Sequence, residues 1–264
     1  MSVNAKMTAI ADAIRAKTGK SDLLTLDQMP TEIASISGGG GSDEDLVGAL
    51  ISNTLTEIDS DAASVVGYAC RGMTKIKTVN LPECTSVGTY GFYGCTGLTD
   101  VNIPKCESIG SYSFYGCSYL TSVNAPLAET LSAQAFRNCA RLVNVVFPSV
   151  ETVRGTVFYG CSRLVTVDFH SLTNFNGDSV FAVCSELKAL IIRNTESVVT
   201  LSGTNVFSSS TMGASGIGYV YVPSALVETY KSATHWSSYA SKIRALEDYT
   251  IDGTITGELD ESKI

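Results

Sequence analysis

The cysteines and histidines are the residues whose types could support metal binding, redox chemistry or nucleophilic catalysis. The chain of 264 residues contains eight cysteines and two histidines. Neither His170 nor His235 stands at a spacing typical of metal ligands, so both are interpreted as surface or packing residues. Acidic residues show no paired motif, and the glycines at 38–41 are not followed by the Lys-Ser or Lys-Thr of a phosphate-binding loop. The sequence therefore predicts no catalytic residue, no metal site and no cofactor.

Five cysteines end Phe-x-x-Cys units that recur at steps of 22, 22, 22 and 23 residues. These cysteines are Cys95, Cys117, Cys139, Cys161 and Cys184. Apolar residues follow each cysteine at fixed spacing and usually lead to a proline, as in Leu98, Val101, Ile103 and Pro104. A degenerate copy with Cys70 and Met73 makes six repeats, and a stretched seventh is expected from Phe207 to Pro223.

Such a period is typical of a solenoid, in which each unit is too small to bury its own apolar face and stacks on its neighbours. The alternation at 101–103 and 123–125 predicts short strands that stack in parallel into one long sheet. A second buried ladder is expected on the returning side of each coil, at Val65, Val87, Ile109, Leu131 and Val153.

The repeat predicts that the cysteines are buried packing residues. The repeated cysteine occupies one inward position, where a small apolar side chain with a weak donor packs well. Cys84 and Cys106 share another position, which Ala128 and Val150 fill in the following repeats. One coil apart, Cys84 and Cys106 could reach each other for a disulfide, but the prediction is that both are thiols.

The segment at 109–126, IGSYSFYGCSYLTSVNAP, closely resembles the BspA-type leucine-rich repeat. The resemblance covers roughly residues 65–223 and departs from the pattern in the first copy and at His170, which replaces proline. It implies an α/β repeat solenoid: a right-handed leucine-rich-repeat coil with a parallel β-sheet, closed by a strand and a helix that buries Leu226, Val227, Tyr230 and Trp236. It also implies bacterial surface adhesion or protein binding, not catalysis.

The expected domains follow from this repeat and from the segments around it. They are a helical module at 1–36, a Gly-rich linker at 37–42, an N-terminal cap at 43–64, the solenoid at 65–217, and a cap and tail at 218–264. In the cap, Ser42 or Asp43 is expected to begin a helix that runs through Ile51, and residues 55–58 to start the sheet.

The string at 10–19, IADAIRAKTG, resembles the leader of tail-associated proteins in phages and prophages of Gram-positive bacteria. This resemblance implies that residues 1–36 bind other virion proteins while the solenoid projects outward. The alternative is a helical pair that docks on the solenoid or self-associates. The apolar stripe of Val3, Met7, Ile10 and Ile14 permits a homo-oligomer without fixing its number.

Charge and hydropathy limit the classes of partner that the chain can bind. With 18 basic and 26 acidic residues the net charge is -8, which opposes binding to phosphate backbones and argues against a nucleic-acid partner. The sequence shows neither a secretory signal nor 18 unbroken apolar residues. We therefore expect that the chain is made in the bacterial cytosol and does not insert into a membrane. The leading hypothesis is a phage or prophage tail fibre-like virion protein, released by lysis, whose solenoid attaches to a host-surface protein or glycan. The alternative is a bacterial cell-surface adhesin of the BspA type that binds host protein or glycan.

Two candidate binding surfaces emerge from equivalent repeat positions. The outward face of the predicted sheet carries Thr78, Asp100, Ser122 and Asn144, with Asn80, Asn102 and Asn124 one step on. This polar stripe turns apolar toward the C-terminal end, and a merely solvated sheet face is the alternative interpretation. Tyr93, Tyr115 and Tyr159 form the second candidate, because aromatic planes with polar tips suit sugars or proteins. The parallel ladder of Tyr68, Tyr90 and Tyr112 belongs to the resembled repeat and is interpreted as packing.

Overall fold

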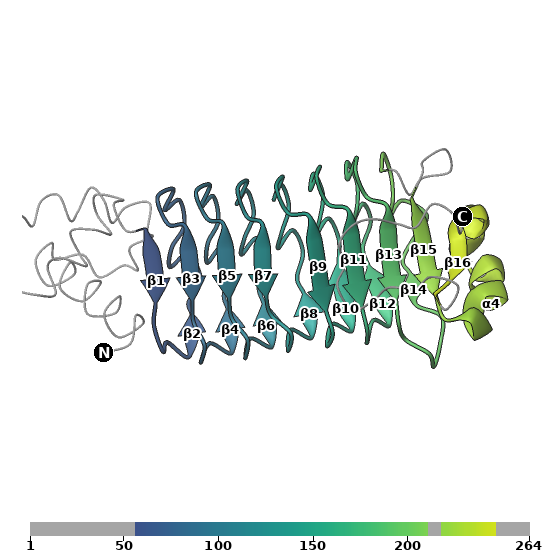
Figure 1. Ribbon diagram of the computed structural model, residues 1–264, viewed down its shortest axis with the longest axis horizontal. Helices are drawn as coiled ribbons and strands as arrows, with labels where there is room; N and C mark the ends of the chain where they lie inside the picture. Colours follow the sequence, from purple (N-terminus) through teal and green to yellow (C-terminus); the bar gives the residue numbers. More distant parts are fainter. Residues whose placement is uncertain (1–55, 211–217, 247–264) are drawn as a thin grey trace, which may run out of the picture.

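The structure is a computed structural model that describes residues 56–210 and 218–246 as an elongated solenoid (Figure 1). The helical module at 1–36, the linker at 37–42, the expected cap helix and the tail after residue 246 lie outside the described residues. From β1 (Glu57–Asp59) onward, each coil contributes one strand to a front face and one to a returning face. The expectation that the sheet starts near residue 58 is confirmed.

The returning face is a single parallel sheet of seven strands. Its strands are β2 (Ser64–Val65), β4 (Ser86–Val87), β6 (Ser108–Ile109), β8 (Thr130–Leu131), β10 (Thr152–Arg154), β12 (Asn174–Asn176) and β14 (Thr200–Leu201). The apolar residue predicted for the second ladder is buried in each of the first five strands. The register places Val65 beside Val87 and Ile109 beside Leu131, so the ladder continues from coil to coil.

The front face consists of two parallel sheets, so the prediction of one continuous sheet is wrong. The first holds β1, β3 (Thr78–Asn80), β5 (Asp100–Asn102) and β7 (Ser122–Asn124). The second holds β9 (Asn144–Phe147), β11 (Thr166–Phe169), β13 (Ala189–Ile192), β15 (Tyr219–Val222) and β16 (Ile243–Ala245). The break coincides with a change in side-chain size, because the inward position that Ala125 occupies in one coil is occupied by Phe147 in the next.

A column of stacked phenylalanines runs through the core. Its members are Phe92, Phe114, Phe136, Phe158, Phe181 and Phe207. Neighbouring ring centroids lie 5.3–5.8 Å apart and the ring planes differ by 4–7°. Phe207 completes the column, which confirms that the seventh repeat begins where the sequence predicts it.

The repeated cysteines form a second internal column beside the phenylalanines. Each thiol is fully buried and donates to a backbone carbonyl of the preceding coil, over 2.9–3.2 Å, as Cys117 Sγ does to Phe92 O. Cys84 and Cys106 donate instead to the carbonyls of Ser86 and Ser108, and all eight cysteines are free thiols. The inward position, the weak donor role and the thiol state are thus confirmed.

A strand-helix-strand segment closes the C-terminal end of the solenoid. After β15 come a 3-10 turn η2 (Ser224–Leu226), α4 (Val227–Ser232), a 3-10 helix η3 (Trp236–Lys242) and β16. Tyr230 and Trp236 are fully buried, and the Trp236 indole donates to the Val199 carbonyl over 2.6 Å. The predicted strand-and-helix cap and the burial of Tyr230 and Trp236 are confirmed, but Leu226 and Val227 are only partly buried. The helix is also divided, so that His235 lies between α4 and η3 at φ 66° instead of within one helix.

One turn position needs the left-handed backbone in every coil. Glycine fills it at 72, 94, 116 and 160, Asn138 adopts φ 62° there, and the β-branched Val183 adopts φ 61°. A β-branched residue in this region is strained by roughly 1–2 kcal/mol, whereas asparagine tolerates it. We therefore expect Val183→Asn to raise the free energy of unfolding by about 1 kcal/mol in urea denaturation followed by circular dichroism.

Gly116→Val is the matched control for this expectation. A Cβ at Gly116 meets no atom closer than 3.9 Å, so the added strain is conformational and not steric. In the same measurement, the free energy of unfolding of Gly116→Val should be lower than that of the unmodified chain by roughly 1–2 kcal/mol. A stability for Val183→Asn below that of the unmodified chain would contradict the expectation.

Candidate binding surfaces

The N-terminal half of the front face presents a ladder of side-chain amides. Asn124 donates to Asn102, Asn102 to Asn80, and Asn80 to the carboxylate of Asp59, each over 2.7 Å. The adjoining column holds Thr78 and Asn144, both half-buried, and Asp100 and Ser122, both exposed. The sequence therefore placed all seven polar residues correctly at the front face. Because the amides satisfy one another, the ladder also stabilises the stacking of the coils.

On β11 and β13, in the C-terminal half of the same face, the outward side chains are closed to solvent. Thr166, Asp168, Ala189 and Ile191 are buried, and the last two pack with Tyr221, Tyr219 and Leu246 in a small apolar cluster outside the main core. The predicted change from polar to apolar along the stripe is confirmed. The accessible polar part of the front face thus lies mainly over β1, β3, β5 and β7.

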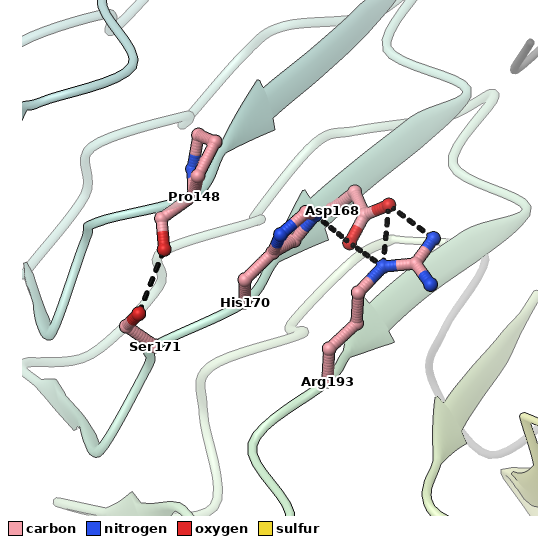
Figure 2. Close-up of polar contacts among 5 residues, drawn as sticks. All are labelled: Pro148, Asp168, His170, Ser171 and Arg193. Atoms are coloured by element: carbon pink, nitrogen blue, oxygen red, sulfur yellow. Dashed lines mark hydrogen bonds and ion pairs between the residues drawn. The ribbon is translucent and has the colours of Figure 1, made fainter. Parts of the chain in front are cut away.

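An ionic group lies at the end of β11 (Figure 2). The buried Asp168 carboxylate accepts from Arg193 Nε and Nη2 at 2.8–3.1 Å, and His170 Nε2 lies 3.5 Å from it. Ser171, next in the chain, donates to the Pro148 carbonyl over 2.8 Å (Figure 2). A Ser-His-Asp relay requires the hydroxyl to be hydrogen-bonded to the imidazole. Ser171 donates elsewhere and Asp168 is neutralised by Arg193, so this group is arranged as a structural ion pair.

Burial removes the reactivity that the five repeated cysteines would need for chemistry. It raises the pKa of Cys95 and Cys184 to about 12, and that of Cys117, Cys139 and Cys161 well above the ordinary 9.0. A thiolate is the nucleophile and metal ligand, so these side chains stay inert near neutral pH. Within 56–210 and 218–246, no group of three or more His, Cys, Asp or Glu residues is placed to hold a metal ion.

Tyrosines form two adjacent columns on the segments that lead from the returning strands to the front strands. In the first column, Tyr90 stacks between Tyr68 and Tyr112 at centroid distances of 4.9 and 4.7 Å. The three rings pack on one another, as predicted, but they do so at the surface, where Tyr68 remains 40% exposed. In the second column, Tyr93 stacks on Tyr115 at 4.9 Å, with both side chains half-buried.

Arginines lie on both sides of the Tyr93–Tyr115 stack in the second column. The Arg71 guanidinium lies 5.2 Å from the Tyr93 ring, and that of Arg137 lies 5.8 Å from Tyr115 and 4.2 Å from Tyr159. Tyr159, predicted as a member, is therefore separated from Tyr115 by an arginine. Sequence reasoning followed only the tyrosines and missed the arginines, although they occupy the same repeat position.

A third column, which the sequence interpretation also missed, lies next along these segments. The Arg141 guanidinium lies 3.8 Å from the ring centroid of Tyr119, and the Tyr119 side chain is 47% exposed. The next residue in the repeat register is the exposed Arg163. Cation–π contact of this kind contributes roughly 0.5–1 kcal/mol at exposed sites. The three columns together form a surface dominated by tyrosine and arginine.

Comparison with known proteins agrees with this architecture. Six copies of the BspA type leucine rich repeat region match residues 49–130 and 107–218. The crystal structure of the T. pallidum leucine rich repeat protein is similar, with a TM-score of 0.52 and 24% identity over 64% of this chain and 75% of that one. The pneumococcal vaccine antigen PcpA gives a TM-score of 0.53 and 16% identity over 71% of this chain and 44% of that one. No curated protein shows a significant sequence match to the chain. Repeat pattern, fold and family match agree, and the chain belongs to the BspA-type leucine-rich-repeat family.

Proposed function

We propose that this chain is a non-enzymatic binding protein that acts at a bacterial surface as a BspA-type adhesin. The observation that carries the proposal is the set of tyrosine and arginine columns on an otherwise acidic molecule. Tyrosine and arginine are enriched at the energetically dominant positions of protein interfaces. Extended solenoids typically use such repeated surfaces to contact partners.

The comparisons support the surface setting over the virion setting. The family match covers the solenoid, and PcpA, which shares the fold, is described as a vaccine antigen. Among the described residues no helix is both long and apolar enough to cross a bilayer. Attachment to a virion through residues 1–36 stays a prediction that depends on the string at 10–19.

Surface labelling of intact bacteria tests this function. Antibody against the purified chain should label whole cells, and brief protease treatment of intact cells should remove the label while a cytosolic marker persists. The purified chain should also bind to a panel of immobilised extracellular-matrix proteins. Label confined to broken cells, together with no binding across the panel, would overturn the proposal. Recovery of the chain by mass spectrometry from purified phage particles would favour the virion hypothesis instead.

A further inference from the structure

Basic residues outnumber acidic residues on one edge of the solenoid, and acidic residues outnumber basic residues on the other. We call the segments 66–77, 88–99, 110–121, 132–143 and 155–165, which lead from returning to front strands, the long edge. Backbone hydrogen bonds such as Tyr90 N to Ser111 O and Tyr112 N to Ala133 O join these segments side by side. Over these five coils the long edge carries six basic residues and no acidic residue: Arg71, Lys75, Lys77, Arg137, Arg141 and Arg163. The corresponding segment of the next coil, 177–188, adds Lys188 together with Asp178 and Glu186, so the edge as a whole stays positive.

The opposite edge has the reverse charge. We call the segments 81–85, 103–107, 125–129 and 148–151, which lead from front to returning strands, the short edge. It carries four glutamates and one lysine: Glu83, Glu107, Glu129, Glu151 and Lys105. Lys105 is paired with Glu83 over 2.6 Å, so the remaining charge of this edge is negative. A molecule of net charge -8 thus keeps one edge positive, and that edge also holds the three aromatic columns.

Stacking decides which kind of partner the long edge suits. Both faces of the Tyr90 ring are covered by tyrosines. Tyr93 and Tyr115 stack on each other, and the guanidinium groups of Arg71 and Arg137 lie over the Tyr93 ring and the Tyr115 ring, respectively. Sugars and nucleic-acid bases bind aromatic side chains by stacking on an open ring face. Tyr90, Tyr93 and Tyr115 instead present ring edges and phenolic hydroxyls beside guanidinium groups, which suit the carboxylates and polar groups of a protein.

We propose that the long edge is the binding face and that its partner is a protein segment rich in aspartate and glutamate. This inference rests on the proposed binding function and names the face and the chemistry of the partner. Arg141 and Arg163 are exposed and supply charge for the first encounter, while the tyrosine hydroxyls and ring edges supply the close contact.

Binding of the full chain to poly-L-glutamate, measured by biolayer interferometry, tests the partner chemistry. We expect saturable binding that weakens at least about tenfold between low and high ionic strength, since exposed charges are screened by salt. Dextran sulfate and a single-stranded oligonucleotide serve as the competing polyanions. Equal or tighter binding to either of these, per charge, would overturn the assignment to an acidic protein.

Paired charge-reversal variants test the face. Arg141→Glu with Arg163→Glu should weaken binding to poly-L-glutamate by at least about tenfold. Lys105→Glu with Lys231→Glu makes the same change in net charge on the short edge and on α4, and should weaken binding by less than about twofold. Circular dichroism would confirm that both variants are folded. Equal losses in the two variants would overturn the long edge as the binding face.

The same variants separate this inference from the proposed function. If the unmodified chain labels the cell surface and binds the matrix panel, while the long-edge variant binds as tightly as the control variant, the adhesin function stands and the long edge is wrong. If the unmodified chain neither labels cells nor binds the panel, the proposed function itself fails.

Discussion

Replacing Phe136 by alanine is expected to lower the free energy of unfolding by about 3–5 kcal/mol, as measured by urea denaturation. Phe136 is fully buried, stacks on Phe114 and Phe158, and also contacts the Phe147 ring at 6.0 Å. Removing the ring opens a cavity in the middle of a continuous column. Backbone hydrogen bonds fix the spacing between the neighbouring coils, so these coils cannot move together to fill the cavity.

The position of Phe136 adds a second expected effect. Solenoid stability depends on each coil contacting its neighbours, so a gap between coils weakens the coupling of the two halves. The unfolding transition of Phe136→Ala should therefore be broader than that of the unmodified chain. Val146→Ala is the matched control, because Val146 is 40% exposed in the adjoining strand and its loss should cost within about 0.5 kcal/mol. A cost below about 1 kcal/mol for Phe136→Ala would contradict the role of the column.

The second large effect is a loss of stability at alkaline pH. Burial raises the pKa of Cys95 and Cys184 from 9.0 to about 12, and raises the pKa of Cys117, Cys139 and Cys161 well above 9.0. Between pH 9 and about pH 12 the thiols of the unfolded chain lose their protons, whereas those of the folded chain keep them. The contribution of the protonated thiols to the free energy of unfolding is thus complete below pH 9 and declines as the pH rises toward 12. Each buried thiol should contribute a loss of about 1.4 kcal/mol per pH unit in that window.

Urea denaturation at about pH 8 and about pH 10 measures this loss. Cys117→Ala with Cys139→Ala is the informative variant, because it is less stable at both pH values but no longer has two of the titrating thiols. The difference in stability between the two pH values should shrink by about 3 kcal/mol in this variant. An unchanged difference would show that the thiols are not the source of the alkaline loss.

The interior of this solenoid could be predicted from the sequence because its side chains repeat. Phe114 and Cys117 recur at one period with their apolar followers, and identical spacing in a parallel stack places equivalent residues in one column. The terminal Trp236 could be placed for a similar reason, since a large apolar residue after the last repeat must cover an open end. These inferences needed only periodicity and burial.

The outer surface was less predictable because its columns are not uniform in residue type. Arg137 and Arg71 stand in a tyrosine column, so following tyrosines alone missed the cation–π stack. Tyr68 packs against Tyr90 as its place in the repeat predicts, but the repeat pattern did not indicate that this stack lies at the surface. The break in the front sheet coincides with the size difference between Ala125 and Phe147, which a polar/apolar pattern does not record.

The uniform register has a consequence for how the gene can change. Val79, Val101 and Val123 are aligned strand to strand, so residues one period apart are interchangeable neighbours. Unequal recombination between repeats of equal length would add or delete a whole coil and rejoin the chain in register. Each such event would lengthen or shorten the molecule by about 4.8 Å while leaving both ends intact. The reach of this protein can thus evolve in fixed increments, separately from the composition of its edges.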